Sequence, residues 1–317
     1  MTNRVLPGEK LTVLKVNYLN QPNCYKLTNG TVEVIVTTDV GPRIIRYGFP
    51  GEENILGEVP ETVIKTELGD WKPWGGHRLW TAPEANPRSY VPDNSPLEYE
   101  LDGEHSIRLT QSTEPQTGIQ KEMTVTLEAT GAGLIVHHKI TNRGLWSIDV
   151  ALWALTIMNG GGTAIFPQEP YRSWDDYLLA ARPLVLWHYT DLSDARWAIG
   201  KKYIQLKTDA EVEAPQKMGI ANKQGWAAYH RNRTLFVKRF SYQEDANYPD
   251  YGSNNETYTA GSFIEIESLG PIGRLEPGAA ATHVERWSLY NDVELDASEE
   301  SIDRALKQTL MRDHEPA

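Results

Sequence analysis

Histidine, arginine and tryptophan stand together in the segment WGGHRLW, residues 74–80. His77 and Arg78 supply hydrogen-bond donors for hydroxyl groups, and Trp74 and Trp80 supply flat apolar faces beside them. The two glycines ahead of them let the backbone turn tightly or approach a ligand closely. A carbohydrate needs this combination, because its hydroxyls bind polar groups and its C–H patches pack on aromatic rings. The alternative is a loop pinned to the core by its tryptophans, with an ordinary surface arginine.

Two glutamates alternate in the segment FIEIES, residues 263–268. Strand alternation places Glu265 and Glu267 on one face, where each carboxylate raises the pKa of the other, as suits a general acid or base. The solvent face of a half-buried strand explains the same spacing. A third candidate, Arg43, follows a Gly-Pro pair, and its guanidinium is suited either to two hydroxyls or a carboxylate of a ligand, or to a surface salt bridge.

The remaining histidines do not indicate a metal site. His137 and His138 are adjacent on a predicted strand, so one is exposed, the other is buried, and they cannot share one metal ion. The chain has no HExxH or CxxC spacing and no GxGxxG or Walker pattern. We therefore expect no metal, no nucleotide and no other cofactor.

Alternation of apolar and polar residues dominates the chain and predicts strands. They are expected at 32–36, 119–128, 134–141, 148–158, 203–208, 226–230, 234–241, 262–268 and 282–290. Only residues 298–311 have a helical period, which predicts a short C-terminal helix capped by Ser298. Residues 71–96 have no period and predict an ordered functional loop that forms one wall of a concave face. The pattern as a whole predicts an all-β sandwich of antiparallel strands.

Length and composition narrow the classes of function. The 317 residues suit a single all-β domain over residues 1–317, and the net charge of −12 argues against nucleic acid as a partner. The chain contains no run of 18 apolar residues, so we expect no membrane span. The first residues lack the apolar region of a signal peptide. The single cysteine, Cys24, cannot form an intramolecular disulfide, which fits a reducing, cytoplasmic location. The oligomeric state is not indicated.

The order of these motifs is the informative feature. A strand with GPRI at 41–44 is followed by the Gly-Gly-His loop, a paired strand ending in Asn142, the glutamate strand, and LEPG at 275–278. In this order, over about residues 25–290, the chain resembles the galactose-mutarotase-like superfamily, which includes aldose 1-epimerases and hexose-6-phosphate epimerases. Segments such as WGGHRLWTAPE and YGSNNETYT resemble a bacterial branch of it. The resemblance implies a galactose-mutarotase-like β-supersandwich that holds a small-molecule sugar.

The resemblance also implies a mechanism. In that superfamily a glutamate on a late strand accepts the anomeric proton and a histidine protonates the ring oxygen, so that the anomers of an aldose interconvert. The base corresponds to Glu267 or Glu265, with Glu267 the first choice, and the acid corresponds to His77. The residues implied to bind the sugar are Arg43, Arg78, Trp74, Trp80 and Trp153. The chain departs from the pattern at Trp153, near which classical members carry the acid histidine.

Three functional hypotheses follow from the sequence. The first is a metal-free aldose 1-epimerase-like isomerase of carbohydrate metabolism that works by general acid–base catalysis. The second is a non-catalytic carbohydrate-binding module on the same scaffold, which Trp153 favours. The third is a lyase or hydrolase acting on a glycan, which predicts a long open groove instead of a closed pocket.

Overall fold

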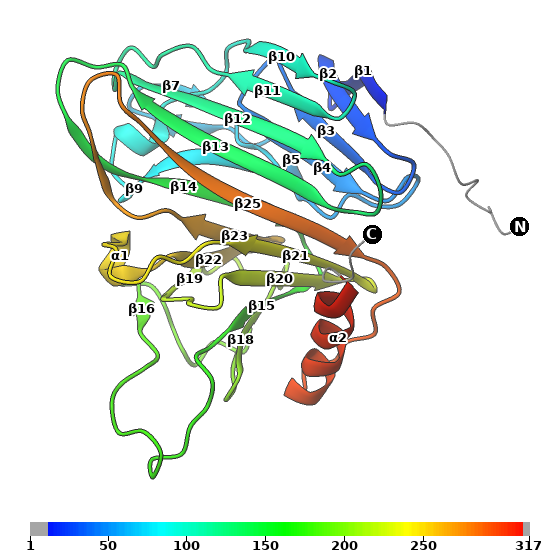
Figure 1. The fold of residues 1–317 in the computed structure, drawn as a ribbon, viewed down its shortest axis with the longest axis vertical. Helices are drawn as coiled ribbons and strands as arrows, with labels where there is room; N and C mark the ends of the chain where they lie inside the picture. The colour runs from blue at the N-terminus through cyan, green and yellow to red at the C-terminus, as the bar shows by residue number, and fades with distance from the viewer. Residues whose placement is uncertain (1–11, 313–317) are drawn as a thin grey trace, which may run out of the picture.

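Two large antiparallel sheets, stacked face to face, make up most of the protein (Figure 1). The computed structural model describes residues 12–312. The predicted domain of residues 1–317 extends beyond the described residues at both ends. The N-terminal residues from which we expect no signal peptide also lie outside the described residues. Within residues 12–312 there is no helix with the length and apolar character needed to cross a membrane.

The larger sheet carries most of the candidate residues named above. Its strands lie in the order β1 (Thr12–Tyr18), β2 (Gln21–Thr28), β3 (Glu33–Thr37), β4 (Arg43–Gly48), β9 (His77–Ala82), β14 (Ile148–Asn159), β23 (Phe263–Leu269), β22 (Asn255–Ala260), β19 (Gln216–Ile220) and β16 (Leu184–Leu186), and β24 (Gly273–Leu275) also pairs with β14. The central strands β9, β14, β23 and β22 therefore come from three distant parts of the chain.

The smaller sheet runs across the front of the molecule in Figure 1, and β4, β9 and β14 of the larger sheet lie behind it. Its order is β10 (Glu98–Asp102), β11 (Ser106–Thr110), β12 (Ile119–Leu127), β13 (Leu134–Asn142), β25 (Ala280–Tyr290), β21 (Thr234–Phe240), β20 (Trp226–Arg231), β15 (Thr163–Pro167), β18 (Tyr203–Lys207) and β17 (Trp197–Ile199). Two short ribbons pair β5 (Glu58–Val59) with β8 (Trp74–Gly75) and β6 (Ile64–Thr66) with β7 (Gly69–Trp71).

The hydrophobic core fills the space between the sheets. In β12 every second side chain is buried, from Ile119 to Leu127, as expected for a strand with one face on the core. β14 differs, because its inward Leu152 and Met158 join this core while its outward Trp153 and Leu155 join a second buried cluster. The nearly continuous apolar run of β14 therefore reflects a strand covered on both faces.

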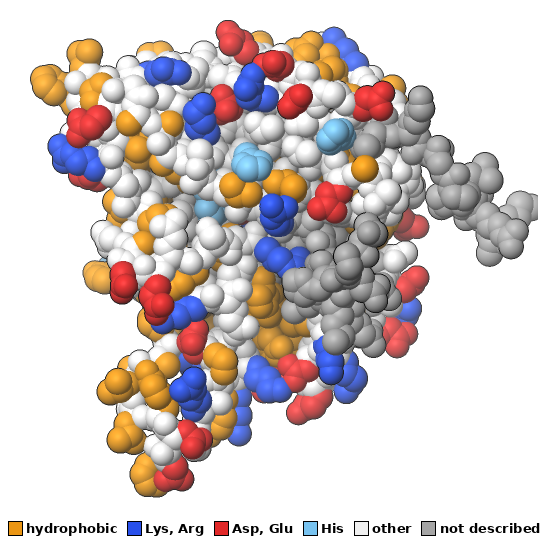
Figure 2. Space-filling view, in the orientation of Figure 1, with side chains coloured by type: hydrophobic (Ala, Val, Ile, Leu, Met, Phe, Trp, Pro, Cys, Tyr) orange, Lys and Arg blue, Asp and Glu red, His pale blue; other side chains and the backbone are white. Residues whose placement is uncertain are grey.

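The helices are few and peripheral. Helix α2 (Glu299–Arg312) packs Ile302 and Leu306 on the outer face of the smaller sheet, at lower right in Figure 1, and Ser298 caps it through a 3.3 Å hydrogen bond from the Ser301 N–H. The other two are a single turn, α1 (Pro249–Gly252), and a 3₁₀ turn, η1 (Arg88–Tyr90). Residues 168–183, between β15 and β16, project from the body with exposed apolar side chains (Figure 2).

The all-β antiparallel fold with its C-terminal helix is confirmed, and each predicted strand lies within a few residues of an observed one. The loop predicted for residues 71–96 is wrong in its middle part. Residues 77–82 form β9, a central strand between β4 and β14, with all six side chains buried. Because both faces of β9 are covered, its sequence has no alternation of apolar and polar residues, and the period that would reveal a strand is missing.

Candidate functional site

Strand register brings the polar candidates together on the outer face of the larger sheet, the face turned away from the core. Residues directly paired across neighbouring strands point to the same face. Pairings from β4 to β22 place Arg43, Arg78, Leu155, Glu267 and Glu256 in one row. The sequence-predicted residues Arg43, Arg78 and Glu267 therefore share a face although they are up to 224 positions apart.

A second row lies beside the first on the same face. It consists of Lys217 on β19, Tyr258 on β22, Glu265 on β23 and Ile157 on β14. Strand alternation accounts for both rows, because Glu265 and Glu267 are two residues apart on β23.

The second row, together with Arg78 and Leu155 of the first, lines a cavity of about 470 Å³. The cavity has the size of a small-molecule site. Aromatic rings form one continuous side of it: Trp80 lies 5.1 Å from Trp71, 4.9 Å from Tyr90 and 5.6 Å from Trp153, measured between ring centroids. The predicted sugar-binding residues Trp80 and Trp153 thus belong to one apolar surface, and Trp71 and Tyr90 extend it.

Arg78 and Glu265 form an ion pair in the wall of the cavity. Arg78 Nη2 lies 3.0 Å from Glu265 Oε1, and both residues line the cavity while remaining largely buried. The guanidinium also lies over the rings of Trp80 and Trp71, at 4.5 and 5.5 Å from their centroids. The charge is therefore held in place by both a carboxylate and two aromatic faces.

Arg43 supports this arrangement from outside the cavity. Its side chain is fully buried and forms a forked pair with Asp93, at 2.9 and 2.7 Å, and Asp93 also accepts a 2.8 Å hydrogen bond from Trp71 Nε1. The structure therefore places Arg43 behind the aromatic surface, where it fixes Trp71 through Asp93.

Several buried polar atoms of the first row have unused hydrogen-bonding capacity. Within residues 12–312, Nε and Nη1 of Arg78, Oε1 of Glu267 and Oε1 of Glu256 have no hydrogen-bond partner. Leaving such atoms unpaired costs free energy, on the order of 1–3 kcal/mol each, so they are commonly paired with ligand or solvent. For Arg78, which lines the cavity, a ligand hydroxyl would meet this need.

Lys217 joins the two rows electrostatically. Its Nζ lies 3.0 Å from Glu256, 3.7 Å from Glu267 and 4.0 Å from Glu84, and also over the ring of Trp153 at 4.6 Å. Burial lowers the pKa of Lys217, but the three carboxylates outweigh it and raise that pKa above its ordinary value. Burial raises the pKa of Glu256 well above its usual range and that of Glu267 to about 7. Two buried glutamates beside one ammonium therefore retain a proton near neutral pH.

Glu267 lies beneath the cavity surface. Its side chain is fully buried, and Trp153 Nε1 donates a 2.7 Å hydrogen bond to its Oε2. Glu265, by contrast, lines the cavity. Of the two glutamates that the sequence could not separate, Glu265 is the one a ligand in the cavity would touch.

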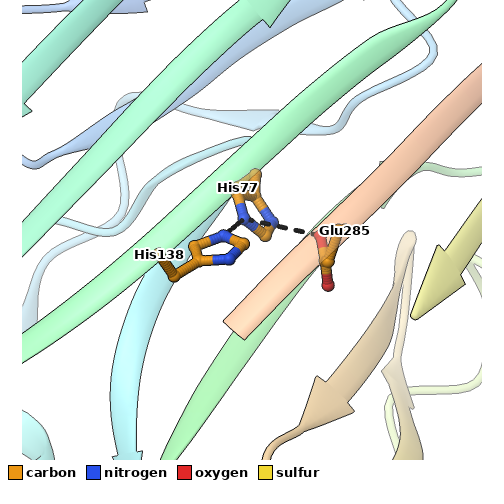
Figure 3. A group of neighbouring side chains, drawn as sticks. All are labelled: His77, His138 and Glu285. Carbon is orange, nitrogen blue, oxygen red and sulfur yellow. Dashed lines mark hydrogen bonds and ion pairs between the residues drawn. The ribbon is translucent and has the colours of Figure 1, made fainter. Parts of the chain in front are cut away.

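His77 lies on the opposite face of β9, because neighbouring residues of a strand point to opposite faces. It pairs in register with Thr156 and Ile44, and its ring lies between the sheets with His138 and Glu285 (Figure 3). This corrects the sequence-based placement of His77 in the sugar site. As expected from strand alternation, His138 is buried and His137 is exposed.

The interior histidines belong to a hydrogen-bonded network whose protons can be assigned. His138 Nδ1 lies 3.1 Å from the His283 carbonyl oxygen, so it carries the proton, and His138 Nε2 accepts from His77 Nε2 at 2.7 Å. His77 Nδ1 must then accept from the Thr156 hydroxyl at 2.8 Å, and Thr156 accepts in turn from Lys238. Each ring nitrogen of His77 and His138 is thereby used.

Glu285 anchors this network. It lies 2.9 Å from Lys238 Nζ and accepts hydrogen bonds from Ser268 and from Trp287 Nε1. Burial raises the pKa of Glu285, but Lys238 and the histidines outweigh it and hold that pKa well below its usual range. A fully buried carboxylate is therefore ionised and compensated by one ammonium.

His77, His138 and Glu285 are also the group in residues 12–312 that has the donor types and proximity of a metal site, with donor atoms within 4.8 Å of one another. A shared ion would have to replace the N–H···N bond between the two imidazoles, whose nitrogens are only 2.7 Å apart. It would also compete with the Lys238 ammonium for Glu285. The donor arrangement therefore fits a hydrogen-bonded network better than a cation site.

Trp74, which the resemblance implied as a sugar-binding residue, does not line the cavity either. Its ring packs against the buried cluster of Cys24, Ile35 and Ile45, and its backbone adopts a positive φ of 58°. The turn at Gly75 and Gly76 redirects the chain between Trp74 and β9, so the two tryptophans of the WGGHRLW segment face different surroundings.

Sequence reasoning missed Lys217 and Tyr258, which both line the cavity. Lys217 stands in an ordinary strand pattern, QKMGI, and Tyr258 lies in the segment YGSNNETYT, in which the resemblance implied no site residue. Their place in the cavity depends on the pairing of β19 with β22 and of β22 with β23, and neither local sequence indicates these pairings.

Similarity to known structures is extensive in shape and low in sequence. A galactose mutarotase-like protein from Lactobacillus casei superimposes with a TM-score of 0.53 at 12% identity, covering 84% of this chain and 100% of that one. A galactose mutarotase related enzyme from Lactobacillus acidophilus gives 0.51 at 9%, covering 85% and 98%. This chain has the galactose-mutarotase-like fold.

The galactose-mutarotase-like fold of this chain also resembles part of a larger protein. A TPR-domain containing protein from Parabacteroides distasonis gives a TM-score of 0.58 at 15% identity; the match covers 86% of this chain but 48% of that protein, about half of its length. No protein-family model and no curated protein sequence matches the chain. The comparisons therefore establish the fold, and the function has to be argued from the cavity.

Proposed function

We propose that residues 1–317 form a single carbohydrate-binding domain that interconverts the anomers of an aldose in the cavity on the larger sheet. The observation that carries the proposal is the Arg78–Glu265 ion pair, 3.0 Å long, set against the ring of Trp80 within the cavity. A sugar ring presents an apolar C–H face and a rim of hydroxyls, and this wall offers an aromatic surface beside a donor and an acceptor.

The polar groups suit a ligand rich in hydroxyls. Arg78 retains two nitrogen atoms, Nε and Nη1, without a hydrogen-bond partner in residues 12–312, and Glu265 retains acceptor capacity beyond its ion pair. The positive charges near the cavity are already balanced, Arg78 by Glu265 and Lys217 by Glu256 and Glu267. A neutral sugar fits this charge balance.

The proposed base is Glu265, because it faces the cavity and Glu267 lies beneath it. Glu265 takes the proton of the anomeric hydroxyl while the bond from C1 to the ring oxygen breaks, which opens the ring to the aldehyde. Rotation about the C1–C2 bond and closure on the other face return the proton. Arg78 holds Glu265 in position through the 3.0 Å ion pair, as a positioned base requires.

A non-catalytic carbohydrate-binding module is the second candidate. The observation in its favour is that Trp153 lines the cavity where the resemblance implies an acid histidine, and that none of the described residues lining this cavity is a histidine. Binding alone needs the aromatic surface and Arg78. A cytoplasmic location and a role in carbohydrate metabolism stay predictions.

Polarimetry with α-D-glucose and α-D-galactose, together with ligand-observed NMR titration, tests the proposal. The wild-type protein is expected to accelerate mutarotation, and Glu265→Gln is expected to lose about 10²–10⁴-fold of that acceleration while binding is retained. A wild-type protein that binds either sugar without accelerating mutarotation identifies the binding module. Absence of both binding and acceleration overturns the proposal.

A further inference from the structure

The proposed reaction needs a group that protonates the ring oxygen, and the cavity lining supplies no histidine among the described residues. We propose that Tyr258 is this proton donor and acts opposite Glu265. The inference rests on the proposed function and adds a catalytic residue to it.

Strand register places the two residues side by side. Tyr258 on β22 pairs directly with Glu265 on β23, and both side chains line the cavity. Direct cross-strand neighbours have Cβ atoms about 4.5–5.5 Å apart. A sugar bound against Glu265 through its anomeric hydroxyl therefore lies within reach of the neighbouring phenol, and the ring oxygen is bonded to the same carbon as that hydroxyl.

The other proton donors of the cavity are already engaged. The Tyr90 hydroxyl donates to Glu84, and Arg78 forms the ion pair with Glu265 and does not release protons at accessible pH. Lys217 is engaged as well, because its Nζ lies 3.0 Å from Glu256, 3.7 Å from Glu267 and 4.0 Å from Glu84.

Two phenols remain, and their positions differ. Tyr189 belongs to the segment between β16 and β17 and is 43% exposed, whereas Tyr258 is half-buried in a central strand. No hydrogen bond from another group in residues 12–312 acts on either hydroxyl. Burial, followed by the charge of Glu265, raises the pKa of Tyr258, so the phenol is protonated at neutral pH as a donor must be.

The proton balance of the step closes without another reactant. The Tyr258 O–H gives its proton to the ring oxygen as the bond from C1 to that oxygen breaks, and Glu265 takes the proton of the anomeric hydroxyl as the C1 carbonyl forms. On closure the new C5 hydroxyl returns its proton to Tyr258, and Glu265 returns the other to the carbonyl oxygen. Both groups end in their starting states.

The test compares Tyr258→Phe with Tyr189→Phe, two variants that each remove one phenol hydroxyl from the same cavity. We expect Tyr258→Phe to lower kcat for mutarotation of α-D-glucose or α-D-galactose by about 10²–10⁴-fold. KM and the affinity measured by NMR titration are expected to change little, and Tyr189→Phe is expected to lower kcat far less than Tyr258→Phe does.

Each other outcome has one meaning. Unchanged kcat in Tyr258→Phe, or a loss confined to Tyr189→Phe, overturns the assignment of Tyr258 while an active wild type leaves the proposed function standing. A loss that appears only in KM also overturns it, because it identifies a binding contact. A wild-type protein without activity overturns the proposed catalysis itself, and the assignment with it.

Discussion

Trp153 and Glu267 lie on neighbouring strands, and the indole Nε1 of Trp153 donates a 2.7 Å hydrogen bond to Oε2 of the buried glutamate. One edge of this indole therefore binds a carboxyl group below the surface while the ring itself lines the cavity. Trp153, near which the superfamily resemblance implies an acid histidine, thus has a structural role in this protein. It connects the aromatic surface to the buried group of Lys217, Glu256 and Glu267.

Replacing Trp153 with Phe is expected to destabilise the protein. The variant keeps an aromatic ring but leaves Glu267 Oε2 without its donor, and an unpaired buried acceptor costs about 1–3 kcal/mol. Denaturant unfolding of the two proteins measures the difference. Trp80→Phe is the matched control, because Trp80 lies in the same aromatic surface and its indole makes no hydrogen bond to a carboxylate among residues 12–312. Equal losses in the two variants would show that the hydrogen bond contributes nothing.

Replacing Lys238 with Met is expected to cost about 3–5 kcal/mol, because the fully buried Glu285 loses the ammonium 2.9 Å away. Urea denaturation near pH 7 measures the loss. Lys139→Met removes an exposed lysine that lies 3.6 Å from Glu122, and it is expected to cost less than about 1 kcal/mol. Adding Glu285→Gln to Lys238→Met should recover part of the stability; a double variant worse than both single ones would contradict this account.

Gly76→Ala is expected to destabilise the protein strongly. Gly76 has a φ of +67°, and a Cβ there would lie 2.1 Å from the carbonyl oxygen of Ile44 on β4. Gly261→Ala is the control, since its φ of +61° is similar and nothing lies within 4 Å of the added carbon. The control isolates the cost of a positive φ, about 1 kcal/mol. If thermal unfolding gives the two variants the same loss, the close approach to β4 is not what requires glycine.

The elements of the fold were largely predictable, because alternation along a half-buried strand is a local signal. It indicated β12 and β13, in which burial largely alternates along the strand. It also indicated the glutamate strand β23, although both faces of that strand are buried. It failed at β9, where both faces are covered and the residues His77 to Ala82 have no period. The two glycines before β9 were expected to allow a tight turn or a close approach to a ligand. The structure has the turn, and the close approach of Gly76 is to the backbone of β4.

The site was predictable only in part, because its geometry depends on pairing between distant strands. The sequence nominated Arg78, Glu265 and Trp80, which the structure brings to one cavity. The sequence also pointed to His77, but the side chains of His77 and Arg78 point to opposite faces of β9. Arg78 therefore lines the cavity, and His77 lies between the sheets. Lys217 and Tyr258 had no local signal, since their neighbours on β22 and β23 are set by register.

The buried titratable groups are expected to shape the pH dependence of stability in two opposing ways. Burial lowers the pKa of His138 to about 3 and of His283 to about 4, and holds that of His77 well below its ordinary value. The unfolded chain protonates these histidines near pH 6.5, so stability is lost as the pH falls from there towards the folded values. Glu256 and Glu267 oppose this, since their raised pKa values make the folded state keep protons that the unfolded chain releases above about pH 4.3.

The two effects nearly cancel between about pH 4.5 and 6.5, where the unfolded state binds at most about one extra proton from these groups. Below about pH 4.3 the glutamate contribution disappears, and Glu285 adds to the histidines because its pKa is held low in the folded state. Stability should then fall by up to about 4 kcal/mol per pH unit, because His283 starts to bind a proton in the folded state near pH 4. Urea denaturation from pH 3 to 8 measures this profile. His138→Gln is expected to reduce the slope of stability against pH in acid by the equivalent of about one proton. His137→Gln, on the exposed face of the same strand, should leave this slope unchanged. Equal profiles for the two variants would exclude the interior histidines as the cause.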